Sequence, residues 1–203
     1  MDYFYSVKHD CSYEEKIKRS RFIAHLHYCE TMRAAKEYIS LINKEHKNAN
    51  HNCWAYIVGK NAENEHCSDA GEPSGSAGKP MLNSLKKHNT TNIVAVVTRY
   101  FGGVKLGIRG LIDAYASVVE KALEQNQLIK LVDTKKIVIE TTYDFSEKFK
   151  YDVKELLAEV IEITYLEKVT YNIEVESSLS KPLFDYLEEL SGSKKIIYSL
   201  IEK

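Results

Sequence analysis

The side chains that could take part in catalysis lie in two polar segments of the first half of the chain. His51 directly precedes an apolar run, and Asp69, Glu72, Ser74 and Ser76 belong to a later glycine-rich stretch. A histidine base, an orienting carboxylate and a serine hydroxyl are the groups that nucleophilic hydrolysis uses. Ser74, however, does not lie in a G-x-S-x-G turn between a strand and a helix. These residues leave open a small hydrolase (a peptidase, esterase or phosphoesterase) that would use His51 and Asp69.

A third segment, residues 98–110, has the features of a binding loop. It reads T-R-Y-F-G-G-V-K-L-G-I-R-G, and it follows the apolar run at residues 93–97. Glycines allow the backbone to approach a bound group closely, and the free N–H groups of a helix start attract anions. Arg99 and Lys105 add positive charge. The spacing matches neither a phosphate-binding Walker loop nor a dinucleotide fingerprint, so the loop predicts a polar or anionic ligand without naming it.

The glycine-rich stretch at residues 68–80, S-D-A-G-E-P-S-G-S-A-G-K-P, is expected to lie at the surface because it can bury little apolar area. Pro80 is suited to the first turn of a helix that continues through Leu85. Together the segments predict a ligand-binding or partner-binding surface formed by His51, Asp69, Glu72, Ser74, Ser76, Lys79, Arg99, Tyr100, Gly102, Gly103 and Lys105.

Two histidines and two cysteines raise the question of a metal site. His51 and Cys53 are two residues apart, and His66 directly precedes Cys67. Structural zinc sites favour C-x2-4-C and H-x3-5-H pairs, and adjacent residues of an extended chain point to opposite faces. We therefore expect neither a metal nor another cofactor.

The composition restricts the class of partner. The 203 residues carry a net charge of −1, with 44% hydrophobic and 28% charged residues, so nucleic-acid binding would need a local positive patch. Four cysteines in a chain of this length do not form a disulfide framework, and we expect no disulfide-linked partner. No signal peptide and no membrane-spanning run is evident. The sequence therefore predicts a cytoplasmic protein without a membrane partner.

The order of the elements predicts an α+β protein of two domains, residues 1–130 and residues 136–203. In the first we expect strands near residues 18–28, 54–59, 63–68 and 93–97, and helices after Thr31, from Pro80 and from Leu111. The helices are expected to cover one face of the sheet. In the second, strands at residues 137–143, 162–166, 169–176 and 195–201 alternate with helices over residues 145–160 and from Ser180. This βαββαβ order is that of a ferredoxin-like domain.

Three motifs taken together resemble the IMPACT family, specifically its bacterial YigZ-type members. They are A-N-H-N-C-W-A-Y at residues 49–56, D-A-G-E-P-S-G-S-A-G-K-P at residues 69–80 and V-V-T-R-Y-F-G-G-V-K-L-G at residues 96–107. The basic strand K-R-S-R-F-I-A at residues 18–24 agrees with this resemblance. The resemblance implies that the first domain has a fold similar to domain 2 of ribosomal protein S5. It also implies that the C-terminal domain is similar to the late domains of elongation factor G.

The chain departs from the family pattern at the start of the predicted third helix. Arg109 replaces a glycine, and Asp113 stands where many members carry a basic residue. Arg109 bears on how closely that helix start can approach a ligand, and Asp113 lowers the positive potential one turn later.

The resemblance implies a translation-linked role, because eukaryotic members regulate translation by binding an activator of a stress-response kinase. We therefore expect a noncatalytic regulatory or binding protein that contacts RNA, the ribosome or a translation-associated protein through a glycine-rich polar cleft. The small hydrolase is the alternative.

Overall fold

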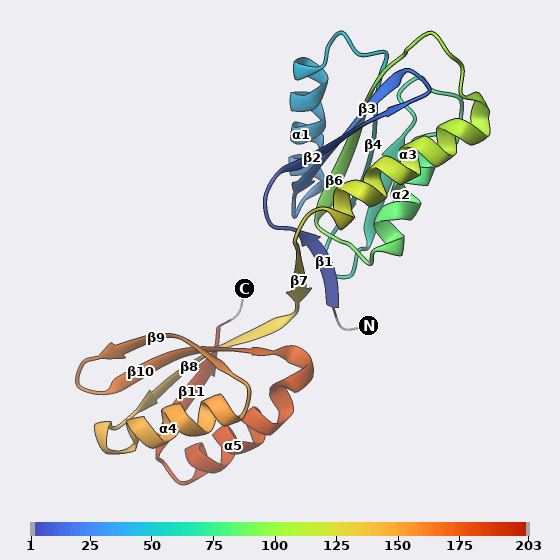
Figure 1. The fold of residues 1–203 in the computed structure, drawn as a ribbon. Coiled ribbons are helices and arrows are strands. Elements are labelled where there is room, and N and C mark those ends of the chain that lie inside the picture. Colours follow the sequence, from blue (N-terminus) through green and yellow to red (C-terminus); the bar gives the residue numbers. More distant parts are fainter. Residues whose placement is uncertain (1–2, 202–203) are drawn as a thin grey trace. The chain divides into compact units, whose positions relative to one another are not determined.

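The computed structural model describes residues 3–201 and separates into two compact units (Figure 1). One unit comprises Tyr3–Leu131, and the other begins at Val132. Each unit encloses its own cluster of buried apolar side chains. Among residues 3–201, no helix has both the length and the apolar character needed to cross a membrane. The molecule is of the mixed α+β class that the sequence predicted.

The larger unit is built on a five-stranded sheet in the order β2-β3-β6-β4-β5, in which every neighbouring pair is antiparallel. Its strands are β2 (Cys11–Ile17), β3 (Ser20–Tyr28), β4 (His51–Val58), β5 (Asn64–Ser68) and β6 (Ile93–Tyr100). The apolar run that opens β6 is buried on both faces, as its lack of alternation requires. The sheet thus carries both β4 and β6, the strands that hold the predicted site residues His51 and Arg99, side by side.

Helices cover both faces of this sheet, so the expectation of helices on one face was wrong (Figure 1). Helices α2 (Gly78–Lys87) and α3 (Gly107–Glu124) pack on one face, against a cluster that includes Phe22 and Val97. Helix α1 (Met32–Glu45) packs on the other, against Tyr56 and its neighbours. Helices are needed on both faces because β4 and β6 carry apolar side chains on both faces of the sheet.

Helix α1 begins where the sequence predicts. The Thr31 side chain accepts a hydrogen bond from the backbone N–H of Ala34 at 3.1 Å, which satisfies one free donor of the first turn. The helix buries one apolar stripe, which consists of Ala35, Tyr38, Ile39 and Ile42.

Three strands at the edges of the unit were not predicted. Strands β1 (Tyr3–Val7) and β7 (Leu128–Val132) pair with each other, and β2 pairs with β3. The expected start of β3 at Lys18 was wrong, because Lys18 and Arg19 both have positive φ (43° and 70°) and form the turn between β2 and β3. Polar two-residue turns of this kind connect twisted antiparallel strands.

The smaller unit confirms the predicted βαββαβ order. Its elements are β8 (Thr134–Thr141), α4 (Tyr143–Glu155), β9 (Glu159–Tyr165), β10 (Val169–Glu176), the short 3-10 turn η1 (Ser177–Leu179), α5 (Ser180–Gly192) and β11 (Ile196–Leu200). The sheet order β11-β8-β10-β9, antiparallel throughout, is the ferredoxin-like arrangement.

The predicted end of α4 needs one correction. This helix was expected over residues 145–160, but it ends at Glu155, and Val160 belongs to β9. Leu157 has φ 60° and its side chain is 68% exposed. The apolar residues that follow the helix continue its spacing in the sequence, so the helix was predicted to be longer than it is.

Candidate functional site

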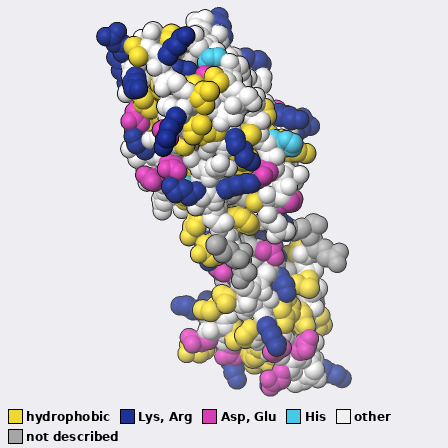
Figure 2. Space-filling model, turned by 90° about the vertical axis from the view of Figure 1, so that its right-hand side faces the viewer, with side chains coloured by type: hydrophobic (Ala, Val, Ile, Leu, Met, Phe, Trp, Pro, Cys, Tyr) yellow, Lys and Arg dark blue, Asp and Glu magenta, His cyan; other side chains and the backbone are white. Residues whose placement is uncertain are grey.

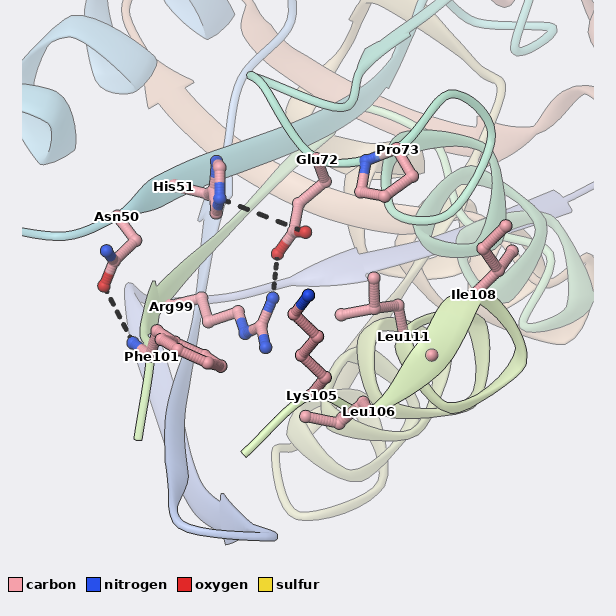
Figure 3. A pocket seen from close by; sticks show the side chains of 11 residues that line it. Asn50, His51, Glu72, Pro73, Arg99, Phe101, Lys105, Leu106, Ile108 and Leu111 are labelled. Carbon is pink, nitrogen blue, oxygen red and sulfur yellow. Dashed lines mark hydrogen bonds and ion pairs between the residues drawn. The ribbon is translucent and has the colours of Figure 1, made fainter. Parts of the chain in front are cut away.

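The larger unit contains a pocket of about 450 Å³ where the end of β6, the glycine-rich loop before α2 and the start of α3 meet (Figure 3). The lining residues are Asn50, His51, Glu72, Pro73, Arg99, Phe101, Lys105, Leu106, Gly107, Ile108 and Leu111. Three segments that are distant in the sequence therefore contribute to one site. Of the predicted site residues, His51, Glu72, Arg99 and Lys105 line this pocket.

A buried ion pair forms the floor of the pocket. Arg99 Nη1 donates to Glu72 Oε1 at 2.6 Å, and both side chains are almost wholly enclosed. The Tyr115 hydroxyl of α3 donates to the same oxygen at 2.9 Å. Burial, followed by the nearby Cys53 and Glu72, raises the pKa of Tyr115 far above its usual range. Tyr115 therefore remains a fixed donor that helps hold the Glu72 carboxylate in place.

The Arg99 guanidinium is only partly satisfied by protein atoms. Its Nη2 reaches Ser20 Oγ at 3.4 Å, but its buried Nε has no hydrogen-bond partner among residues 3–201. Its Cζ lies 5.4 Å from the ring centre of Phe22 and 5.5 Å from that of Phe101. A buried donor without a partner costs free energy, so the Arg99 side chain is held in place at a cost that the ion pair with Glu72 must offset.

His51 faces Glu72 across the pocket (Figure 3). Its Nδ1 lies 3.0 Å from the carbonyl oxygen of Ala70, and a carbonyl only accepts, so Nδ1 carries the proton. Its Nε2 lies 4.0 Å from Glu72 Oε2. That distance is too long for a hydrogen bond, and no described residue donates to Oε2, which leaves an acceptor open at the pocket.

The first turn of α3 supplies the remaining wall. Gly107 opens the helix with φ 77°, a conformation that favours glycine, and no side chain caps the turn. The first backbone N–H groups of an α-helix have no partner within it. Lys105 precedes them and extends toward Arg99 (Figure 3). The wall thus combines free donors and one cation with the side chains of Leu106, Ile108 and Leu111.

Asp69 has a structural position outside the pocket. Its carboxylate accepts from the backbone N–H groups of Gly75 (2.8 Å), Ala77 (2.9 Å) and Gly78 (2.8 Å), the last two at the start of α2. Burial by itself raises the pKa of this carboxyl, but the three donors outweigh burial and hold it below its usual range. Asp69 therefore caps α2 and fixes the glycine-rich loop. Among residues 3–201, His51 contacts Glu72 rather than Asp69.

Six other predicted site residues do not line the pocket. Ser74 and Lys79 are exposed, and Ser76 is buried and donates to the carbonyl of Pro73 at 2.6 Å. Tyr100 contacts His46 Nδ1 at 3.0 Å. The remaining two are glycines, Gly102 and Gly103.

Gly102 has a different structural role. A Cβ on this residue would lie 1.9 Å from the carbonyl oxygen of Arg19, so only glycine allows this close approach of two backbones. The two departures from the family pattern, Arg109 and Asp113, are exposed on α3 and do not line the pocket.

The cysteines and histidines do not converge. Within the described part of the chain, no group of three or more histidine, cysteine, aspartate or glutamate side chains could hold a metal ion. Cys53 Sγ donates to the carbonyl of Asp69 at 2.9 Å, and burial raises the pKa of this thiol to about 12. Cys53 is therefore a protonated packing residue rather than a nucleophile.

Sequence reasoning missed several lining residues. Asn50 Oδ1 accepts from the backbone N–H of Phe101 at 2.8 Å and joins the β4 and β6 ends. Phe101 lies in the predicted binding loop, where packing was the expected role of its ring. Leu106, Ile108 and Leu111 were read only as loop or helix positions. The available signal was the pairing of β4 with β6, which brings residues 50–51 beside residues 99–101.

Comparisons with known proteins agree with this geometry. The model of the Impact N-terminal domain matches residues 18–123. The chain is 39% identical over 197 residues to IMPACT family member YvyE of Bacillus subtilis, covering 96% of this chain and 89% of that one. It is 43% identical to IMPACT family member YigZ of Escherichia coli over 113 residues, 55% of each chain.

A solved structure covers the whole arrangement. A crystal structure of a hypothetical protein matches with a TM-score of 0.65 and 28% identity, over 100% of this chain and 99% of that chain. With the domain match, it confirms the mixed α+β class, with an N-terminal part similar to domain 2 of ribosomal protein S5.

Proposed function

Because this chain belongs to the IMPACT family, we propose that it is a noncatalytic binding protein that contacts a component of the translation machinery through the pocket of its larger unit. The partner class is RNA, the ribosome or a translation-associated protein. The observation that carries this proposal is the buried Arg99–Glu72 pair: both residues line the pocket, and Glu72 Oε2 accepts no hydrogen bond from the described residues. Donors and acceptors held in place before a ligand arrives lower the cost of binding.

The charges on the surface of the larger unit are of both signs. The face drawn in Figure 2 shows Lys and Arg side chains on the larger unit, interspersed with hydrophobic and acidic ones. With a net charge of −1, the whole chain does not generate a strong field for polyanions. The specific donors of the pocket must therefore provide the attraction.

The lining of the pocket favours binding over hydrolysis. None of the eleven lining residues is a serine, threonine or cysteine, so the pocket lacks the hydroxyl or thiol nucleophile of a serine-type or cysteine-type hydrolase. Asp69, the proposed partner of His51 in a hydrolase, is occupied by three backbone donors.

Sedimentation with ribosomes tests the proposal. The wild-type chain is expected in the ribosomal fraction at low salt and, in part, at moderate salt, while the Lys105→Gln variant is depleted from it. Lys148→Gln, which changes an exposed lysine of α4 in the other unit, should behave as wild type. Absence of the wild-type chain from ribosomal fractions at both salt concentrations, together with no shift of RNA, would overturn the proposal.

A further inference from the structure

The two kinds of surface in the pocket point to one class of ligand group. One side is aliphatic, with Leu106, Ile108 and Leu111 along the first turns of α3. The other carries Lys105, the free N–H groups of α3 and the Arg99 guanidinium. A ligand that fills the pocket must therefore combine an aliphatic body with an acceptor group, because each unmatched polar atom would cost binding free energy.

The charge balance of the pocket limits the charge of the anion that it can bind. The cations Arg99 and Lys105 face the carboxylate of Glu72, which leaves one net positive charge in the pocket when His51 is neutral. The start of α3 adds roughly half a positive charge. This field matches a group with a single negative charge. A phosphate dianion would face the Glu72 carboxylate, and the repulsion between these like charges disfavours it relative to a monoanion.

The open oxygen of Glu72 indicates that the ligand also carries a hydrogen-bond donor. Oε1 already accepts from Arg99 and Tyr115, whereas Oε2 has only His51 Nε2 at 4.0 Å. With Nδ1 of His51 protonated by its contact with the Ala70 carbonyl, a neutral His51 does not donate to Oε2. A ligand N–H group would donate a hydrogen bond to Oε2 and so satisfy the second oxygen of the carboxylate.

We propose that the pocket binds the carboxyl-terminal residue of a protein chain, with an aliphatic side chain and a free carboxylate. The carboxylate accepts from Lys105 and the first amides of α3, beside the positive charge of the Arg99 guanidinium. The backbone N–H of the same residue donates to Glu72 Oε2, and its side chain packs on Leu106 and Leu111. This inference rests on the proposed binding role of the pocket, and it selects a translation-associated protein over RNA as the partner.

A pair of small probes tests the inference on the full-length chain. N-acetyl-L-leucine carries the N–H, the aliphatic side chain and the carboxylate, whereas N-acetyl-L-leucinamide lacks only the charge. In a ¹⁵N-labelled sample, millimolar N-acetyl-L-leucine is expected to shift the amide resonances of Gly107 and Ile108, and the amide probe should shift them at least tenfold less. Lys105→Gln should weaken binding of the acid by about tenfold, and Lys148→Gln should leave it unchanged.

Other outcomes separate this inference from the proposed function. Equal binding of the acid and amide probes, or no binding of either, overturns it. A response of the same resonances to the dinucleotide uridylyl-(3′→5′)-uridine, whose phosphodiester carries the single negative charge of an RNA backbone, but not to N-acetyl-L-leucine also overturns it and assigns the pocket to RNA. In either case, Lys105-dependent sedimentation with ribosomes would leave the proposed binding function in place. If neither the binding of N-acetyl-L-leucine nor the sedimentation with ribosomes is observed, both the inference and the proposed function are overturned.

Discussion

At the scale of single residues, the site depends on charges that are removed from water. Arg99 and Glu72 are 5% and 9% exposed, and they satisfy each other at 2.6 Å. Such a pair contributes little net stability compared with apolar replacements, but either partner alone is costly, since it leaves an uncompensated buried charge. The pair therefore holds the Arg99 guanidinium and the Glu72 carboxylate, with its open Oε2, at fixed places in the lining of the pocket.

We expect Arg99→Gln to lower the free energy of unfolding by about 3–5 kcal/mol, because Glu72 would remain buried without its cation. The double variant Arg99→Met with Glu72→Leu should lose less, since no charge is left alone. Urea denaturation at pH 7 measures both. A double variant less stable than Arg99→Gln would contradict this account of the pair.

The backbone of Gly107 gives another prediction at this scale. Gly107→Ala should cost about 1–2 kcal/mol, because its φ of 77° strains a residue with a Cβ even where space is open. Gly192→Ala is the matched control: its Cβ also meets open space, but its φ is not positive. That variant should be neutral or slightly stabilising. Thermal denaturation compares them, and equal effects would exclude strain at Gly107.

At the scale of elements, the start of α2 shows how one side chain organises a loop. Its own N-cap residue, Ala77, offers no side-chain oxygen, so Asp69 of the preceding loop supplies the acceptor. A negative charge at a helix start is also favoured by the helix dipole. The loop that carries Glu72 into the pocket is thus tied at both ends.

Asp69→Asn should destabilise the protein by about 1–2 kcal/mol at pH 7, because the amide cannot accept at both oxygen positions. The pKa of Asp69 is lowered in the folded state. Its stabilisation is therefore present above the unfolded value of about 3.9, and it is lost as the pH falls through the folded value. Urea denaturation from pH 7 to pH 3 should show the two proteins converging at the acid end. A constant difference across that range would refute the charge-based cap.

Much of the element level could be predicted from the sequence. The Thr31 cap, the stripe of α1 and strand β10 all follow local periodicity, which is strong where one face is buried. Strands β1, β2 and β7 could not be predicted in this way, because they are edge strands with few fully buried side chains.

For the site, local reasoning found the polar residues but not their partners. His51 and Glu72 were singled out by type, yet their facing arrangement depends on the pairing of β4 with β6 and on the loop that Asp69 fixes. The aliphatic wall from α3 carried no chemical signal, since Leu106 and Ile108 read as ordinary loop and helix positions. Contacts between distant segments thus account for what sequence reasoning missed.

At the scale of the whole molecule, each unit contains its own core. The larger unit buries clusters on both faces of its sheet, and the smaller buries a separate cluster around Phe149 and Tyr171. We propose that the two are independent domains, with the boundary at residues 130–136. Fragments 1–131 and 132–203 should each unfold cooperatively in urea, with midpoints close to those of two transitions of the intact chain. Fragments without a cooperative transition would contradict independent folding.

The central claim is that the pocket of the larger unit contacts a translation component, and site-directed photocrosslinking tests it most directly. Ile108 at the pocket and Ile197 in the other unit are both 62% exposed, so a photoreactive amino acid at each gives a matched comparison. In living cells, we expect position 108 to crosslink to RNA, a ribosomal protein or a translation-associated protein, and position 197 not to. Equal crosslinking at both positions, or none of these partners at position 108, would contradict the claim.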